Sequence, residues 1–280
     1  MRINHNLMAM NTHRQLGVNN NATSKSVEKL SSGLRINRAG DDAAGLSISE
    51  KMRGQIRGLE KASRNSQDGI SMIQTAEGAL NETHAILQRM RELSVQAAND
   101  TNVDTDRTAI GEELSELGKE ITRIKDNTEF NTQNLLDGSA GSSGTVTLQV
   151  GANSGQTMDL AFGTSGIDLS SVNSAVGSLG ASDVATASAA TALISTVNAE
   201  LESVSAGRSK LGAYQNRLEH TIKNLDNAAE NVQAAESRIR DVDMAKEMMD
   251  FTKNNILKQA SQSMLAQANQ QPQGVLQLLR

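Results

Sequence analysis

The sequence predicts a mainly α protein in which long heptad-patterned helices form a bundle with a small β-hairpin region. Three observations support this fold class. Apolar residues recur at spacings of three and four over three long segments. Aromatic residues make up only 1% of the 280 residues, so aliphatic side chains and alanine must fill the core. Between the second and third segments, two short stretches alternate apolar and polar residues, as strands do.

The first heptad segment follows a turn-like stretch at residues 39–42, where Asp41 and Asp42 are interpreted as a turn and helix cap. It predicts a helix over residues 44–99, about 80 Å long at about 1.5 Å per residue. One heptad row carries mostly large residues and the other mostly small ones, which permits close helix approach. The large row is Leu59, Ser66, Ile73, Leu80, Leu87 and Ser94, and the small row is Ala62, Gly69, Ala76, Thr83, Met90 and Ala97.

The second segment extends from Val103 to Ile124, after a turn at residues 99–102, and the third extends from Val197 to Ile239. The third keeps its register, with a few polar interruptions that we interpret as solvent-facing positions. Together the three segments predict a shared apolar core. Its expected members are Leu59, Ile73, Leu80, Leu87, Leu117, Ile121, Leu211, Leu218, Ile222 and Leu225.

The region between these segments has a different character. Residues 138–144 are rich in glycine and serine and predict a flexible loop. Residues 145–150 and 157–162 alternate apolar and polar side chains, and residues 151–155 between them contain two glycines, so we expect a hairpin. Residues 163–190 are rich in serine, alanine, glycine and threonine, and we expect them to be exposed.

Both ends of the chain have thin apolar stripes. The first stripe begins with Ile3, Leu7 and Met10 and is interrupted at residues 19–21 by three asparagines. The last stripe ends in Val275, Leu276, Leu278 and Leu279, before Arg280. Such sparse stripes cannot stabilise isolated helices, so each end needs a partner.

Catalytic and ligand-binding motifs are missing from the sequence. The chain has no cysteine and therefore no disulfide or thiolate metal site, and its four histidines do not have metal-ligand spacing. No phosphate-binding loop, dinucleotide fingerprint or nucleophile elbow occurs. We therefore expect no catalytic, cofactor-binding or metal-binding residues, no cofactor, and no enzyme activity.

Charge and hydropathy bear on the partners. No lysine or arginine lies between Lys125 and Arg208, where eight acidic residues occur, and no concentrated basic patch stands elsewhere. Binding to nucleic acid is therefore not expected. No run of eighteen apolar residues predicts a membrane span. The first residues lack the apolar core of a signal peptide, so we expect any export to proceed without a cleaved signal.

Four motifs resemble those of the bacterial flagellins. LSSGLRINRAGDDAAGL at residues 30–46 and SQDGISMIQTAEGAL at residues 66–80 are similar to the amino-terminal core of that family. AESRIRDVDMA at residues 235–245 and QANQQPQGVLQLLR at residues 267–280 are similar to its carboxyl-terminal core. The resemblance covers residues 1–138 and 192–280, and the middle matches a minimal member without large variable outer domains.

The resemblance implies a subunit of the flagellar filament, outside the bacterial cell, exported through the flagellar type III secretion apparatus. It also implies a division of the chain. Residues 1–42 and 238–280 would be helical inner-core segments that pair in the filament, with Ile3, Leu7, Met10, Val275, Leu276, Leu278, Leu279 and Arg280 as assembly residues. Residues 43–138 and 191–237 would be outer-core helices, and residues 139–190 a hairpin and exposed region.

Several partners follow from the same resemblance. The first is the chain itself, as a helical homopolymer. The others are an export chaperone at the carboxyl terminus, the filament cap, the hook-junction proteins and a host Toll-like receptor. Residues 87–96 (LQRMRELSVQ) resemble the segment that this receptor recognises, and the contact residues carried over by position are Arg89, Leu93 and Glu113.

Two alternatives remain open from the sequence. The first is a hook–filament junction protein of the same superfamily, although the ending VLQLLR and the continuous NRAGDDAAGL favour the filament subunit. The second is a secreted coiled-coil adhesin or signalling protein, which would leave the apolar termini without a purpose.

Overall fold

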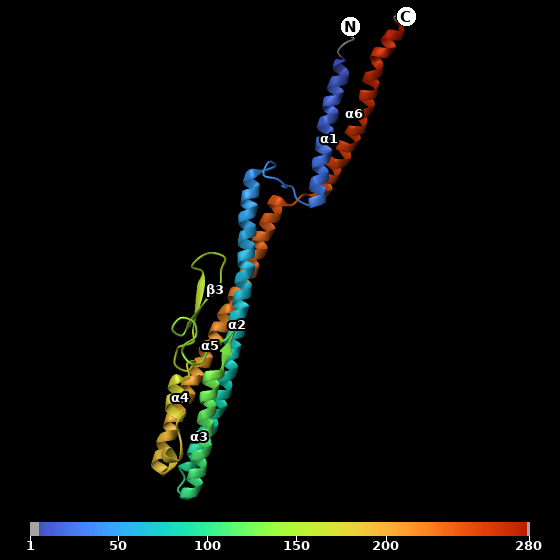
Figure 1. Ribbon diagram of the computed structural model, residues 1–280. Coiled ribbons are helices and arrows are strands. Elements are labelled where there is room, and N and C mark those ends of the chain that lie inside the picture. The colour runs from blue at the N-terminus through green and yellow to red at the C-terminus, as the bar shows by residue number, and fades with distance from the viewer. Residues whose placement is uncertain (1–5, 279–280) are drawn as a thin grey trace. The chain divides into compact units, whose positions relative to one another are not determined.

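The computed structural model describes residues 6–278, with side chains described as far as residue 271. The chain divides into two compact units (Figure 1). One unit is Ile56–Ala229, and the other combines the described residues up to Gln55 with those from Glu230 onward. Helices α2 (Ala43–Ala97) and α5 (Ala187–Arg240) each contribute residues to both units.

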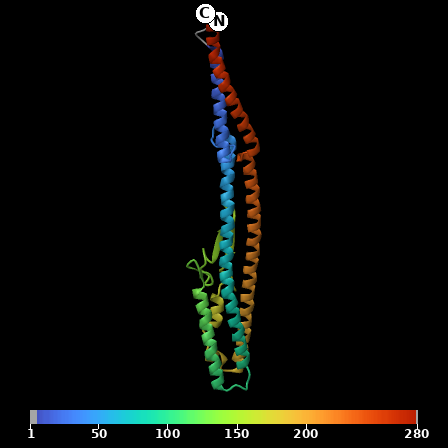
Figure 2. The same cartoon turned by 90° about the vertical axis from the view of Figure 1, so that its right-hand side faces the viewer.

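The unit Ile56–Ala229 is built on three helices. Within it, α2, α5 and α3 (Asp104–Asn127) lie side by side in both views (Figures 1 and 2). The helices predicted from the three heptad segments are therefore confirmed. The bounds of α2 differ from the predicted residues 44–99 by one or two positions, while α5 begins ten residues before Val197.

The two heptad rows of α2 form the centre of this unit. Every residue in both rows is buried, including the polar ones: Leu59, Ser66, Ile73, Leu80, Leu87, Ser94, Ala62, Gly69, Ala76, Thr83, Met90 and Ala97. The buried hydroxyls lose no hydrogen bond, because Ser66, Thr83 and Ser94 each donate to the backbone carbonyl four residues earlier. Small and polar residues can therefore occupy core positions without an unpaired group.

The core predicted from the sequence is mostly buried. Leu117 and Ile222 are the exceptions, because their side chains are only partly buried. Leu117 packs at the edge of the main cluster. The predicted core therefore included two residues that lie at the edge of the buried region or outside it. The buried members are Leu59, Ile73, Leu80, Leu87, Ile121, Leu211, Leu218 and Leu225.

The predicted hairpin is confirmed. Strands β3 (Thr145–Gln149) and β4 (Thr157–Ala161) pair antiparallel, with Thr145 opposite Ala161 and Gln149 opposite Thr157. A second, shorter pair was not predicted: β1 (Glu129–Phe130) and β2 (Gln133–Asn134) flank a turn in which Asn131 and Thr132 have positive φ angles.

The hairpin packs on α2 at a glycine. A Cβ atom built on Gly69 would lie 2.3 Å from Cδ1 of Leu148, so the absence of a side chain admits the leucine of β3. A similar approach occurs at α5, where a Cβ on Gly207 would lie 2.2 Å from the carbonyl oxygen of Gly166. Small residues thus bring the chain between α3 and α5 into close contact with the helices.

The prediction that residues 163–190 are exposed is wrong in part. This stretch contains α4 (Ser170–Val176) and the 3₁₀ helix η1 (Ala181–Val184). Most of its large apolar side chains are fully buried and join the same core as the bundle: Ile167, Leu169, Val172, Val176 and Val184. Their spacing along the chain is irregular, but each packs against a preformed helical surface.

The second unit contains the terminal helices α1 (Leu7–Ser32) and α6 (Met244–Leu278), which lie side by side and antiparallel (Figures 1 and 2). Helix α1 continues through the three asparagines at residues 19–21. Asn19 is buried and its Nδ2 donates to Oγ of Ser261 at 2.9 Å. Lys29 forms an ion pair with Glu247 at 3.6 Å. Polar contacts therefore contribute to this pairing.

The stretch between α1 and α2 is a turn and a helix cap, as predicted. Oδ1 of Asp42 accepts from the backbone N–H of Gly45 at 2.8 Å and so caps α2. Oδ2 of Asp41 accepts from the backbone N–H groups of Arg38 and Asn37. These two bonds, led by that of Arg38, lower the pKa of Asp41 below its ordinary value.

We predict that the heptad core determines the stability of the Ile56–Ala229 unit. Leu80 and Leu218 are both 0% exposed. Leu80→Ala or Leu218→Ala should therefore each lower the free energy of unfolding by ~2–5 kcal/mol, since each leaves a cavity. The control is Gln74→Ala at an exposed position of α2. Chemical denaturation of the monomer measures all three, and neutral leucine variants would contradict the register.

Candidate functional site

The terminal helix pair exposes a large apolar surface. Of the described residues in α1 and α6, those that are buried are Asn19, Ser26 and Ala268, and none of them is a large apolar residue. Large apolar side chains instead face outward: Leu7, Met8, Met10, Val18 and Val27 on α1, and Met244, Met248, Met249, Ile256, Leu257 and Met264 on α6. An exposed apolar surface of this extent marks an interaction site.

The predicted assembly residues fall partly on this surface. Leu7 is 65% exposed and Met10 is 62% exposed. Val275, Leu276 and Leu278 belong to α6, but their side chains lie outside the described part of the structure. Ile3, Leu279 and Arg280 lie outside the described residues altogether.

Most of the exposed methionines on this surface were not among the assembly residues predicted from the sequence. Met248 and Met249 line a shallow hollow of about 400 Å³ on α6 together with Thr252, Lys253 and Ile256. The signal was present in the composition, because most methionines of the chain lie within its first 10 residues and residues 244–264. Methionine is flexible and polarisable, which suits a surface that adapts to a partner.

Two of the three predicted receptor residues meet on the surface of the bundle. Arg89 of α2 donates from Nη2 to Oε1 of Glu113 of α3 at 2.8 Å and from Nε to the same oxygen at 3.0 Å. Arg89 also pairs with Glu92 at 3.3 Å. The Glu113 carboxylate, followed by that of Glu92, raises the pKa of Arg89 above its ordinary value. The pair presents a planar, hydrogen-bonded charged group to solvent.

Leu93 does not share this position. Its side chain is only 2% exposed and belongs to the main core cluster. The expectation that Leu93 is a surface contact is therefore not met, because its side chain is enclosed in the core.

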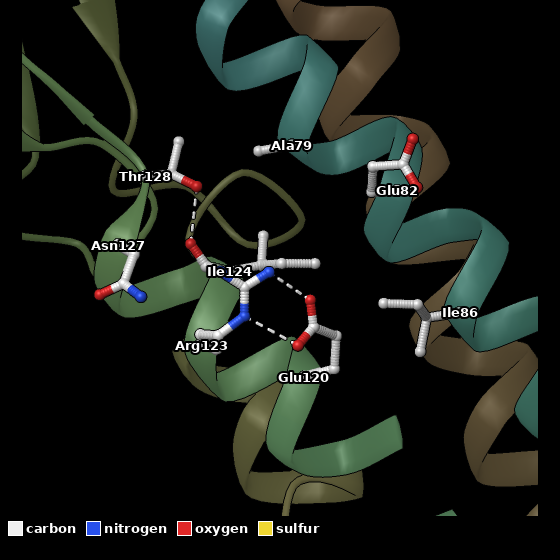
Figure 3. A pocket seen from close by; sticks show the side chains of 8 residues that line it. All are labelled: Ala79, Glu82, Ile86, Glu120, Arg123, Ile124, Asn127 and Thr128. Carbon is white, nitrogen blue, oxygen red and sulfur yellow. Dashed lines mark hydrogen bonds and ion pairs between the residues drawn. The ribbon is translucent and has the colours of Figure 1, made fainter. Parts of the chain in front are cut away.

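A groove of about 330 Å³ lies between α2 and α3 (Figure 3). Ala79, Glu82 and Ile86 border it on α2, and Ile124 and Asn127 border it on α3. Its charged wall is internally paired, because Nε of Arg123 donates to Glu120 at 2.8 Å. That bond lowers the pKa of Glu120. The charged side chains of the groove thus bond to each other, and its lining residues do not place a nucleophile beside a base as a catalytic site would.

The described residues contain no group of three or more histidine, aspartate or glutamate side chains placed to hold a metal ion. Across residues 6–278, no helix has the length and apolar character that crossing a membrane requires.

Comparison with known proteins identifies the family. A model of the bacterial flagellin N-terminal helical region matches residues 3–141, and a model of the C-terminal helical region matches residues 194–279. The chain is 66% identical to flagellin of Halalkalibacterium halodurans over 280 residues, which is the whole of both chains. The chain belongs to the bacterial flagellin family.

Further similarities agree with this assignment. Flagellin of Bacillus subtilis is 57% identical over 304 aligned residues, covering all of both chains. The crystal structure of Bacillus cereus flagellin has 32% identity and a TM-score of 0.50, and covers 62% of this chain and 94% of that one. The resemblance noted from the four motifs is confirmed.

The function follows from the family. The chain is a structural protein that assembles with its own copies into the extracellular filament of the bacterial flagellum. Because the identity to flagellins extends over the whole chain, a hook–filament junction protein and a secreted adhesin are not favoured.

We predict that Leu93 and Arg89 differ in their effect on folding. Leu93→Ala should lower the free energy of unfolding by ~2–5 kcal/mol, because it empties a buried site. Arg89→Ala should leave the melting temperature nearly unchanged, since exposed ion pairs contribute little to stability. Parallel thermal melts by circular dichroism compare the two. Equal losses would mean that Leu93 is not packed as described.

Proposed function

We propose that the terminal helix pair carries the assembly contacts of the filament subunit. The observation that supports this role is the concentration of exposed large apolar residues on α1 and α6, in contrast to the enclosed core of the Ile56–Ala229 unit. Burial of apolar surface drives most protein association. In this proposal residues 1–42 and 238–280 form the inner core of the filament.

The remaining segments have complementary roles in the proposal. Residues 43–138 and 191–237 are the outer-core helices that stiffen the subunit, and residues 139–190 form the hairpin region toward the exterior. A contact between copies that does not close on itself generates an open helical filament. We infer no catalytic activity, in keeping with a structural role.

Export and handling are part of the same proposal. The subunit leaves through the flagellar type III secretion apparatus without a cleaved signal peptide. An export chaperone covers the apolar carboxyl-terminal helix before export, and the cap and hook-junction proteins meet the subunit during filament growth. The exposed methionines of α6 support such a chaperone contact, because they would otherwise promote premature association.

We also propose recognition by a host Toll-like receptor through Arg89 and Glu113. Each side chain is about half exposed, at 51% and 44%, and the two are held in one geometry by their hydrogen bonds. A prearranged charged pair of this kind lowers the ordering cost of binding.

Limited proteolysis tests the assembly role. Arg38 is exposed just after the end of α1, and Lys246 is exposed in the first turn of α6. No lysine or arginine, and so no trypsin site, occurs from residue 126 to 207. Few buried side chains hold α1 and α6 together, so they should open locally in the free monomer. Brief trypsin treatment of the monomer should remove about forty residues from each end, leaving a resistant helical core.

That trimmed core should no longer polymerise on filament seeds, whereas intact filaments should resist the same treatment. Electron microscopy and gel analysis measure the two outcomes. Filament formation by the trimmed core, or equal trimming of monomer and filament, would exclude the terminal helices as the assembly device.

A dose series of receptor activation tests the second role. Arg89→Ala should weaken activation by the monomer because it removes the positive half of the surface pair. Arg64→Ala is the matched control, since it removes the same charge from an exposed position elsewhere on α2. Unchanged potency of Arg89→Ala would refute the recognition proposal.

A further inference from the structure

A proline in α6 leaves one backbone carbonyl without its helical donor. Pro272 lies inside α6 and has no backbone N–H. The carbonyl oxygen of Ala268, four residues earlier, therefore has no i+4 partner within its own helix. Ala268 is only 5% exposed, so solvent has little access to replace the missing donor. A buried carbonyl in this position needs a donor from elsewhere.

The donor comes from the start of α1. Nδ2 of Asn6 donates to the carbonyl oxygen of Ala268 at 2.7 Å. Oδ1 of the same amide accepts from the backbone N–H of Ala9 at 3.1 Å, so Asn6 also caps α1. The two bonds fix the orientation of the amide, because a flipped amide would set donor against donor and acceptor against acceptor. The Asn6 side chain thus caps the N-terminus of α1 and supplies the donor that the Ala268 carbonyl of α6 lacks.

A backbone bridge between Leu34 and Asp241 fixes one end of the pair, where the N–H of Val242 donates to the carbonyl oxygen of Gly33 at 3.0 Å. Between that bridge and Asn6, the other contacts specify the alignment of α1 and α6 only weakly. Large apolar residues of both helices are mostly exposed, so burial does not distinguish one register from the next. The hydrogen bond from Asn19 to Ser261 and the ion pair of Lys29 with Glu247 involve side chains that can adjust to a small shift. The carbonyl of Ala268 cannot adjust, since it is fixed in the helix backbone.

We propose that Asn6 is a positioning residue that fixes the register of the amino-terminal end of α1 against α6 by filling the acceptor that Pro272 leaves free. A slip of this end of α1 along α6 would leave a buried carbonyl without a donor, and such a loss is larger than the gain from an ordinary hydrogen bond. Polar groups at isolated positions specify register in paired helices in the same way. This inference rests on the proposed assembly role of the terminal pair, because one fixed register presents one apolar surface to neighbouring subunits.

A double-mutant cycle in the full-length chain tests the inference. Asn6→Ser keeps a good N-cap residue but is too short to reach Ala268. Pro272→Ala restores the N–H that the carbonyl lacks. The measured quantity is the critical concentration for polymerisation on filament seeds. Asn6→Ser should raise it about tenfold in the parent chain, the effect of leaving one buried acceptor unpaired.

In the Pro272→Ala background, Asn6→Ser should change the critical concentration by less than about twofold, because residue 272 now supplies the donor. Asn81→Ser, at an exposed asparagine of α2 in the Ile56–Ala229 unit, is the matched control and should have no effect in either background. Circular dichroism of each monomer should show an unchanged bundle melting temperature, so that altered assembly is not a folding defect.

An equal effect of Asn6→Ser in both backgrounds, or none in either, would overturn the register inference. Neither outcome bears on the assembly role itself, which depends on whether the trypsin-trimmed core polymerises. The two proposals can therefore fail separately.

Discussion

Close lengthwise packing of α2 against its neighbours is the interaction on which the Ile56–Ala229 unit depends. Aromatic residues are almost lacking, so the core must gain its density from many small contacts along a great length. Both heptad rows of α2 are buried throughout, and their alanines, glycine and hydroxyl residues bring the backbones near. The hairpin, α4 and η1 then add their apolar side chains to a surface that the helices have already formed.

The terminal pair follows a different physical rule. Its buried residues are asparagine, serine and alanine, and most of its large apolar side chains are exposed. Hydrogen bonds rather than apolar burial then align the helices within the subunit, and the apolar area stays available for association. The same chain therefore holds one unit with an enclosed apolar core and another whose apolar surface is not covered by the described residues.

The sequence predicted the parts of the fold whose signal is periodic. Heptads at α2, α3 and α5, and alternation at β3 and β4, repeat often enough to be read without a structure. The burial of Val172 and Val176 was missed because their neighbours are serine, alanine and asparagine, and only tertiary contact encloses them. Motif comparison identified Arg89 and Glu113 correctly as surface residues, yet it could not tell that Leu93 points inward. Neither could it find the contact of Asn6 with Ala268, which joins residues 262 positions apart.

The short connection between β3 and β4 has an evolutionary consequence. Gly155 has a positive φ angle with open space around its Cα, and the neighbouring residues 153–156 are exposed. Lengthening such a loop costs little, about 0.6 kcal/mol for each doubling of its length. New sequence inserted here would leave Leu148 seated on Gly69 and the terminal helices untouched. The exposed loop at residues 153–156 is therefore a place where the chain can gain or lose sequence while the packing of the hairpin on α2 is kept.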